Sequence, residues 1–264
     1  MIKEIPKGMI FAGCSFTHGY GLQYYHVEEH KKYSPDDYEI PTDNDYEWYG
    51  GAENFRRTYR FARQVSKRMG TWSVTRDGVS GNDLENIEFL KMAFQEIPLK
   101  DAMCKHKFNY SEISHVIIQT SYVDRCVPFF KKEIYDKLLL DINKSNDIPE
   151  VEHIVIDFLV HKLTELYRDY AKHLESKGIK VYFLHITEDF KEKFEEDSFL
   201  KKRNIPMINN GVEYFGIDDM MNNDSNAKRI VDDKDFFEEP IEDFHPSLGT
   251  HIIIANSIIK KIDI

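Results

Sequence analysis

The sequence predicts an α/β fold: a three-layer α/β/α sandwich around a mainly parallel sheet of about five strands. Two observations support this prediction. Short apolar runs of strand length alternate along the 264-residue chain with longer segments of helical period, and this order is typical of a parallel sheet with helices on both faces. The hydrophobic content of 41% suits a large core and excludes a wholly disordered chain.

The first half of the chain supplies three of the expected strands. Residues 9–12 form the first, apolar strand and residues 72–75 a short second strand. Residues 116–120 are a continuous apolar run of the kind found in buried parallel strands. Residues 54–69 and 83–94 repeat apolar side chains at helical spacing. The sequence thus predicts strand, helix, strand, helix and strand in that order.

The second half continues the alternation. We expect residues 128–177 to be mostly helical, with an interruption at 143–149, and residues 181–186 to form the clearest strand. Residues 187–242 carry charge runs and are expected to decorate the edge of the sheet. Residues 247–262 are expected to close the chain as a helix.

We expect a single domain over residues 1–264, with insertions at about 20–52, 128–177 and 187–242. Residues 20–52 are rich in Tyr, Asp, Glu and His and show no sustained period. Long loops of this kind are often functional lids, so this segment is a candidate substrate lid, with a solvated insertion as the alternative.

Composition narrows the class of protein. The formal net charge of −11 argues against a nucleic-acid partner, because phosphate binding needs clustered Lys and Arg. The basic cluster at 56, 57, 60, 63 and 67 is interpreted as the solvated face of a helix. The chain starts without the apolar stretch of a signal peptide and has no run of about 20 apolar residues, so we expect a cytoplasmic protein and no membrane partner.

Cys14, Cys104 and Cys126 form no spaced pair. Neither a disulfide framework nor a zinc site is indicated, and we expect no metal and no cofactor. Cys104 and Cys126 are interpreted as buried apolar residues.

Two short segments near the ends of the chain carry the chemistry. Gly13–Gly19 places Ser15 in a glycine-containing turn directly after an apolar strand, and Asp243-Phe244-His245-Pro246 places a carboxylate and an imidazole just before the closing helix. A hydroxyl, a base that takes its proton and a carboxylate that orients the base are the groups needed for nucleophilic acyl chemistry. Ser15, His245 and Asp243 are therefore the candidate catalytic residues.

The residues Ala12–Gly19 resemble the G-D-S-x-x-x-G block of the SGNH/GDSL hydrolases, and Asp243–His251 resembles the closing block of that family. Asp77–Asp83 resembles the block that supplies an oxyanion-hole glycine, and Val116–Ser121 stands where the family has its G-x-N-D block. The resemblance implies a flavodoxin-like SGNH fold, with Ser15 as nucleophile.

The chain departs from this family at two positions. Cys14 stands where the family has Asp, and the third block contains no Asn. We therefore expect an oxyanion hole made of the backbone N–H groups of Ser15 and Gly81, with a side-chain donor from Asn82 or Ser121. These departures are similar to those of outlying, phage-encoded members.

Three assignments stay open at this stage. Glu242 is a rival to Asp243 as the triad acid, because it stands three residues before His245. Cys14 is a rival nucleophile to Ser15. Ser15 could instead cap a short helix without any catalytic role.

The leading functional hypothesis is a serine esterase that hydrolyses a small-molecule or carbohydrate O-acyl ester. An O-acyltransferase with the same triad is a close variant. A non-catalytic binding or structural module that keeps the fold is the alternative from a different class. A phosphate-cradling turn at residues 12–19 is a further reading, but the chain lacks G-x-x-x-x-G-K-[ST] and G-x-G-x-x-G there. The sequence leaves the oligomeric state open.

Overall fold

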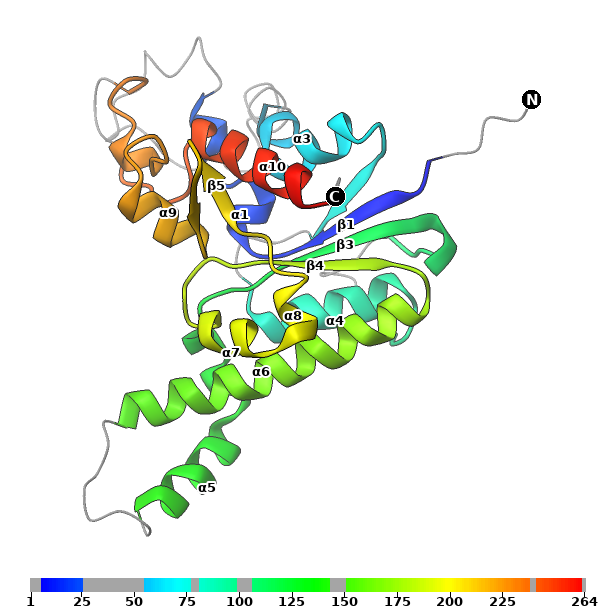
Figure 1. Ribbon diagram of the computed structural model, residues 1–264, viewed down its shortest axis with the longest axis vertical. Helices are drawn as coiled ribbons and strands as arrows, with labels where there is room; N and C mark the ends of the chain where they lie inside the picture. The colour runs from blue at the N-terminus through cyan, green and yellow to red at the C-terminus, as the bar shows by residue number, and fades with distance from the viewer. Residues whose placement is uncertain are drawn as a thin grey trace, which may run out of the picture.

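A parallel sheet lies between two layers of helices (Figure 1). The computed structural model describes residues 6–25, 55–76, 81–98, 106–142, 151–237 and 241–262. The sheet has the strand order β2-β1-β3-β4, and each neighbouring pair is parallel. Its strands are β1 (Gly8–Ala12), β2 (Ser73–Thr75), β3 (Ile113–Gln119) and β4 (Lys180–Leu184). The predicted α/β sandwich is confirmed.

The sheet of the described residues has four strands, where the sequence predicted about five. The position beside β4 is occupied by two single parallel bridges, Phe183 to Asn204 and His185 to Gly216. Pro206 follows shortly after the first bridge and has no N–H to continue the pairing. The chain instead forms a separate antiparallel pair, β5 (Met207–Asn209) and β6 (Val212–Tyr214).

The helices divide between the two faces of the sheet (Figure 1). On one face lie α1 (Ser15–His18), α3 (Phe61–Arg68), α9 (Ile217–Asn223) and α10 (Leu248–Ile262). On the other lie α4 (Asp83–Ala93), α6 (Val151–Ser176), α7 (Lys191–Glu196) and α8 (Ser198–Lys201). The helix α5 (Lys131–Ile142) and the first part of α6 extend away from the sheet. Short 3₁₀ turns occupy Leu22–Tyr25, Tyr110–Glu112, Val123–Phe129 and Ile230–Asp232.

The strands feed two apolar cores, one on each face of the sheet. Ile10, Val116 and Phe183 belong to the core beneath α4 and α6, whereas Phe11 and Ile117 belong to the core beneath α3 and α10. Successive side chains of a strand point to opposite faces, so both sets of strand residues are buried. This explains why the centre of β3, Val116–Ile118, is apolar on consecutive residues.

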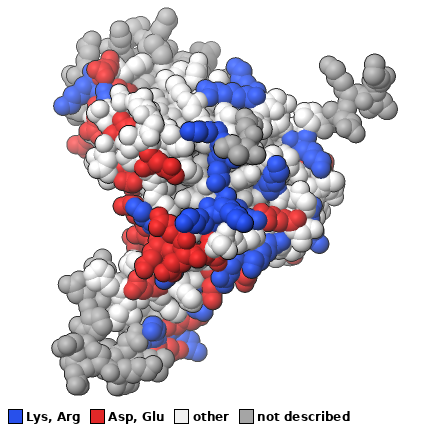
Figure 2. Space-filling view, in the orientation of Figure 1, with Lys and Arg blue, Asp and Glu red and all other residues white. Residues whose placement is uncertain are grey.

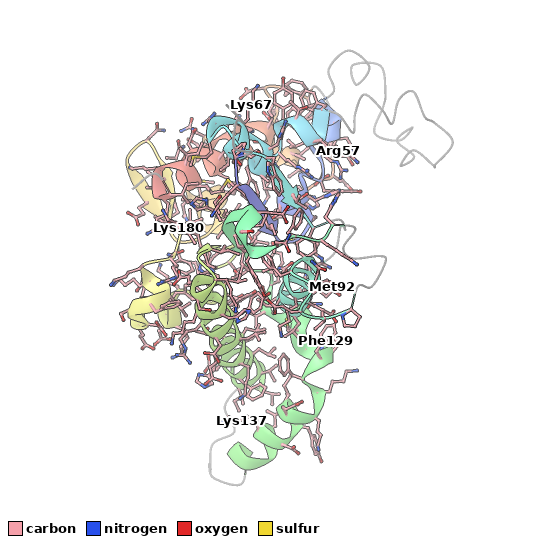
Figure 3. The ribbon with its side chains drawn as sticks, turned by 90° about the vertical axis from the view of Figure 1, so that its right-hand side faces the viewer. Arg57, Lys67, Met92, Phe129, Lys137 and Lys180 are labelled. Carbon is pink, nitrogen blue, oxygen red and sulfur yellow. The ribbon has the colours of Figure 1, made fainter. Side chains whose placement is uncertain are left out.

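The predicted helix at 54–69 is divided in the structure. Residues 55–59 are helical, Arg60 has extended backbone angles (φ −59°, ψ 143°), and α3 starts at Phe61. Within the basic cluster, Arg57, Arg63 and Lys67 are exposed, which agrees with a solvated helix face. Figure 3 shows Arg57 and Lys67 at the outside of this layer.

Residues 26–52 of the candidate lid, the expected interruption at 143–149 and Cys104 lie outside the described residues. Acidic side chains gather over α7 in Figure 2, where Glu188, Glu192, Glu195 and Glu196 are exposed. Among the described helices, none is both long enough and apolar enough to cross a membrane.

Candidate active site

The sheet topology brings three loops to one edge. β1 lies between β2 and β3, so the chain leaves β1 toward one side and returns on the other. In sheets of this kind ligands bind beyond the carboxyl ends of the strands at such a switch point. Ser15, Gly81 and Ser121 follow β1, β2 and β3 respectively, and all three therefore lie at this edge.

A chain of hydrogen bonds joins the three predicted catalytic side chains. The Oγ of Ser15 lies 2.8 Å from Nε2 of His245, and Nδ1 of His245 lies 2.6 Å from Oδ1 of Asp243. An ionised carboxylate can only accept, so Nδ1 carries a proton and Nε2 is left to accept the Ser15 hydroxyl proton. Ser15 and Asp243 are buried, while His245 is 21% exposed. The imidazole is thus the member of the chain that faces outward.

The segment that carries Asp243 and His245 is held against the 3₁₀ turn Ile230–Asp232. The backbone N–H of Ile230 donates to the carbonyl of His245 at 2.9 Å, and that of Val231 donates to the carbonyl of Asp243 at 2.9 Å. Within the segment, the Oδ1 of Asp243 accepts the backbone N–H of His245 at 2.8 Å, an Asx turn that brings the carboxylate to the imidazole. Glu242, the rival acid, is exposed, so the carboxylate beside the imidazole is that of Asp243.

Two aromatic rings flank the imidazole. The ring centroid of Phe16 lies 5.4 Å from that of His245, and the centroid of Tyr20 lies 4.9 Å away. Tyr20 is followed by Gly21, which has φ +88° and would place a Cβ atom 3.0 Å from Oδ2 of Asp243. Only glycine adopts this conformation without strain. The turn therefore brings the Tyr20 ring close to His245 and Asp243.

The turn after β1 is anchored by Gln119 at the end of β3. The Oε1 of Gln119 accepts hydrogen bonds from the backbone N–H of Thr17 (3.2 Å) and from the Thr17 hydroxyl. A Cβ atom on Gly13 would lie 2.1 Å from Oγ1 of Thr17 and 2.6 Å from Oε1 of Gln119, so this position needs glycine. The Nε2 of Gln119 is buried without a partner among the described residues.

The thiol of Cys14 lies 4.0 Å from the Oγ of Ser15. The thiol is buried and points to Oε1 of Gln119 at 3.8 Å. Burial raises the pKa of the thiol, although hydrogen bonding and the charge of Arg125 oppose the rise. A buried thiol with a raised pKa is a poor nucleophile, and the geometry favours Ser15.

The predicted oxyanion donors differ in how they are used. Neither the backbone N–H of Ser15 nor that of Gly81 donates a hydrogen bond to another described residue. The hydroxyl of Ser121 donates to the carbonyl of Gly81 at 3.0 Å, and the Oδ1 of Asn82 accepts from the N–H of Glu85 at 3.0 Å as the N-cap of α4. Both predicted side-chain donors therefore also have structural bonds.

A buried acidic residue supports the loop after β3. The Oδ1 of Asp83 accepts the backbone N–H of Ser121 at 2.8 Å and the hydroxyl of Tyr167. Its Oδ2 is buried without a partner among the described residues. Burial raises the pKa of Asp83 to about 7, against the opposite effect of these two hydrogen bonds.

Two other histidines lie deep in the structure. His185 accepts or donates through Nδ1 to Oγ1 of Thr120 at 3.0 Å, and burial lowers its pKa to about 3. His251 receives the backbone N–H of Phe61 at 3.4 Å and stacks on the Phe61 ring, and burial with the charge of His245 lowers its pKa to about 3. Both are neutral packing residues.

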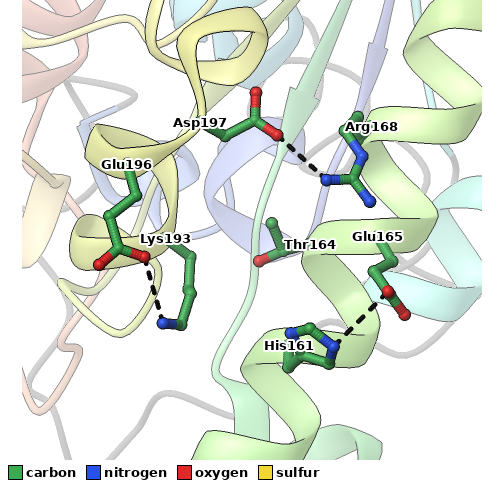
Figure 4. A pocket seen from close by; sticks show the side chains of 7 residues that line it. All are labelled: His161, Thr164, Glu165, Arg168, Lys193, Glu196 and Asp197. Carbon is green, nitrogen blue, oxygen red and sulfur yellow. Dashed lines mark hydrogen bonds and ion pairs between the residues drawn. The ribbon is translucent and has the colours of Figure 1, made fainter.

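Within the described ranges, no group of three or more His, Cys, Asp or Glu could hold a metal ion. An open pocket of about 330 Å³ lies between α6 and the α7–α8 region (Figure 4). Its charged side chains pair with one another, Arg168 with Asp197 and Lys193 with Glu196. None of the predicted site residues lines it.

Sequence reasoning missed Gln119, Asp83 and Tyr20 as parts of this region. A polar Gln at the end of an otherwise apolar strand was the available signal for Gln119, because a buried amide needs partners. The aromatic residue between Gly19 and Gly21 was the signal for Tyr20.

No protein-family model and no curated protein matches this sequence. A solved structure similar to this chain is that of a carbohydrate esterase whose active site is described as displaying divergent catalytic and non-catalytic binding functions. The alignment covers 99% of this chain and 70% of the esterase chain, with 13% sequence identity and a TM-score of 0.47. A similarity at this level assigns neither activity nor substrate.

Proposed function

We propose that this protein is a serine esterase of the SGNH/GDSL type that hydrolyses a carboxylic ester through Ser15, His245 and Asp243. The observation that carries the proposal is the continuous hydrogen-bond chain from the Ser15 hydroxyl through the imidazole to the Asp243 carboxylate, at 2.8 and 2.6 Å. A serine that only caps a helix uses its hydroxyl for a backbone N–H of the first turn, and this role does not require a hydrogen bond to an imidazole. The N-cap position of α1 is occupied by Cys14, and Ser15 is the first residue of the helix.

In the proposed reaction, Nε2 of His245 takes the Ser15 proton as Oγ attacks the carbonyl carbon of the ester. The backbone N–H groups of Ser15 and Gly81 stabilise the oxyanion. His245 then gives its proton to the leaving alcohol, and the acyl group remains on Ser15. A water molecule, deprotonated by His245, releases the carboxylic acid and restores Ser15. The Asp243 carboxylate stabilises the positive imidazole in both halves.

Labelling by a fluorophosphonate probe tests this assignment. The probe should modify Ser15 in the unchanged protein, identified by the mass of the modified peptide. Ser15→Ala should prevent labelling and lower kcat for p-nitrophenyl acetate by a factor on the order of 10⁶.

Ser114→Ala is the matched control. Ser114 lies at the opposite end of β3, where its hydroxyl donates to the carbonyl of Gly8 at 3.0 Å. This variant should label and turn over like the unchanged protein. Turnover that survives in Ser15→Ala would contradict the proposal and favour a non-catalytic module.

A further inference from the structure

An arginine lies beside the proposed active site with part of its guanidinium unused. Arg125 belongs to the 3₁₀ turn Val123–Phe129 after β3 and is exposed. Its Nη1 lies 3.3 Å from the carbonyl of Gly81 and 3.3 Å from Oγ of Ser121. These contacts fix the guanidinium next to the loops that follow β2 and β3.

The guanidinium of Arg125 also stacks on an aromatic ring. The Cζ of Arg125 lies 4.9 Å from the ring centroid of Tyr122, and the Tyr122 hydroxyl donates to Oδ2 of Asp218 at 2.9 Å. A stacked and hydrogen-bonded arginine loses less side-chain freedom on binding a ligand than a free one. The side chain is thus held ready for a ligand.

Arg125 is close to the turn after β1 that carries Ser15. A Cβ atom on Gly81 would lie 3.5 Å from the carbonyl oxygen of Gly13, and Gly81 is the residue whose carbonyl Nη1 contacts. The charge of Arg125 also acts on the Cys14 thiol and on the buried Asp83. A group bound to the guanidinium would therefore lie near the reacting ester.

The remaining donors of Arg125 have no acceptor among the described residues. Its Nε and Nη2 make no hydrogen bond there, and no ion pair joins it to a described carboxylate, including that of Asp124. Nε and Nη2 form an edge that matches the two oxygens of a carboxylate. Such an uncompensated cation is notable in a chain with a net charge of −11.

We propose that Arg125 determines substrate choice by binding a negatively charged group, such as a carboxylate, on the acyl or the alcohol part of the ester. The inference rests on the proposed ester hydrolysis and adds the class of substrate to it. Since Nη1 is occupied by Gly81 and Ser121, the edge of Nε and Nη2 takes the anion. Arg125 is a binding residue and not an additional oxyanion donor in this assignment.

Two matched pairs of esters test the proposal. For the acyl part, p-nitrophenyl hemisuccinate is compared with p-nitrophenyl butyrate. For the alcohol part, 4-carboxyphenyl acetate is compared with 4-carbamoylphenyl acetate. The unchanged protein should prefer the anionic member of at least one pair by about 10- to 100-fold in kcat/KM, the range expected for hydrogen bonds to a charged group.

Arg125→Met should abolish this preference, so that kcat/KM falls by about 10- to 100-fold more for the anionic member than for the neutral member, mainly through KM. A smaller loss shared by both members would reflect the bonds of Nη1 to Gly81 and Ser121. Arg125→Lys should restore part of it, because Lys keeps the charge but not the two-pronged contact. Lys180→Met is the control: it removes one positive charge at the start of β4, at the opposite edge of the sheet (Figure 3). It should leave the preference intact.

Three results would overturn the inference. The first is a lack of preference in both pairs. The second is an equal loss of kcat/KM for the anionic and the neutral ester in Arg125→Met. It would mean that Arg125 supports the oxyanion hole or the buried Asp83. The esterase proposal would survive either result, provided that Ser15→Ala remains inactive. The third result is ester hydrolysis that continues in Ser15→Ala, and it would overturn both proposals.

Discussion

Asp243 contacts His245 twice: its Oδ1 accepts the ring N–H at 2.6 Å and the backbone N–H of the same residue at 2.8 Å. The two residues are separated only by Phe244, so one Asx turn sets the direction of both side chains. The carboxylate thereby fixes the tautomer and the orientation of the imidazole without help from a distant element. This local arrangement explains how a D-x-H spacing can orient an imidazole.

Asp243→Asn should lower kcat by about 10⁴-fold while leaving KM nearly unchanged, because an amide at this position permits the wrong imidazole tautomer. Hydrolysis of p-nitrophenyl acetate by purified variants is the measurement. Glu242→Gln is the matched control one residue away, and it should retain full activity since Glu242 is exposed. A large loss of kcat in Glu242→Gln, together with full activity of Asp243→Asn, would mean that Glu242 and not Asp243 is the catalytic acid.

Gln119→Leu should destabilise the fold by about 1–3 kcal/mol, the usual cost of a buried donor left without its acceptor. The donor is the backbone N–H of Thr17, which bonds to Oε1 of Gln119 at 3.2 Å. Urea unfolding followed by circular dichroism gives the free energy of unfolding. Thr17→Val is the control, because it removes the hydroxyl but keeps the backbone bond, and it should cost less. Equal stabilities for Gln119→Leu and the unchanged protein would show that the turn does not depend on this amide.

The fold was predictable because its signals are local and strong. β3 and β4 are apolar on both faces, as strands covered on both sides must be, and α10 is a regular amphipathic helix. The break at Arg60 and the missing fifth strand were not predictable in this way. Arg60 lies close to the position where Gly19 would carry a Cβ atom, a tertiary contact that apolar spacing does not record. The pairing beside β4 is reduced to single bridges around Pro206, which has no N–H to donate.

The candidate site was predictable where chemistry and spacing coincide, as in Ser15 and in Asp243 with His245. The surroundings of these residues were not. Asp83 belongs to a helix start by its sequence, and only the folded chain shows that its carboxylate is enclosed and bonded to Tyr167, a residue 84 positions away. No sequence period records such a contact, because it joins two separate elements.

Substitutions at Asn82 and Ser121 can test whether either side chain donates to the oxyanion. Asn82→Ser should keep the N-cap of α4, because Ser is as good a cap as Asn, while removing the amide donor. If the hole consists of the backbone N–H groups of Ser15 and Gly81, as we propose, kcat for Asn82→Ser and for Ser121→Ala should each stay within about threefold, against the 10²- to 10³-fold loss typical of a removed donor. A loss of that larger size in one variant, measured with p-nitrophenyl acetate, would assign the donor to that side chain.

Asp83 should make the stability of this protein fall as the pH rises toward neutrality. Burial raises its pKa to about 7 in the folded state, whereas an Asp in an unfolded chain has a pKa of about 3.9. The folded state therefore binds the proton more tightly, so the favourable contribution is complete below about pH 4 and is lost as the pH rises to about 7.

Asp83→Asn is the test of this pH dependence, because the amide oxygen can still accept from Ser121 and Tyr167 while the side chain stays neutral at every pH. The free energy of unfolding, measured by urea titration between pH 4.5 and pH 8, should change little between the variant and the unchanged protein at the acidic end. Toward pH 8 the variant should become relatively more stable, by about 1.4 kcal/mol for each unit of pKa shift. Ser176→Ala is the control, because the Ser176 side chain is exposed and its hydroxyl donates to the backbone carbonyl of His173 at 2.7 Å. It should follow the unchanged protein across the range. Parallel curves for Asp83→Asn and the unchanged protein would mean that Asp83 ionises in the folded state at its ordinary pH and that its two hydrogen bonds, to the Ser121 N–H and the Tyr167 hydroxyl, outweigh its burial.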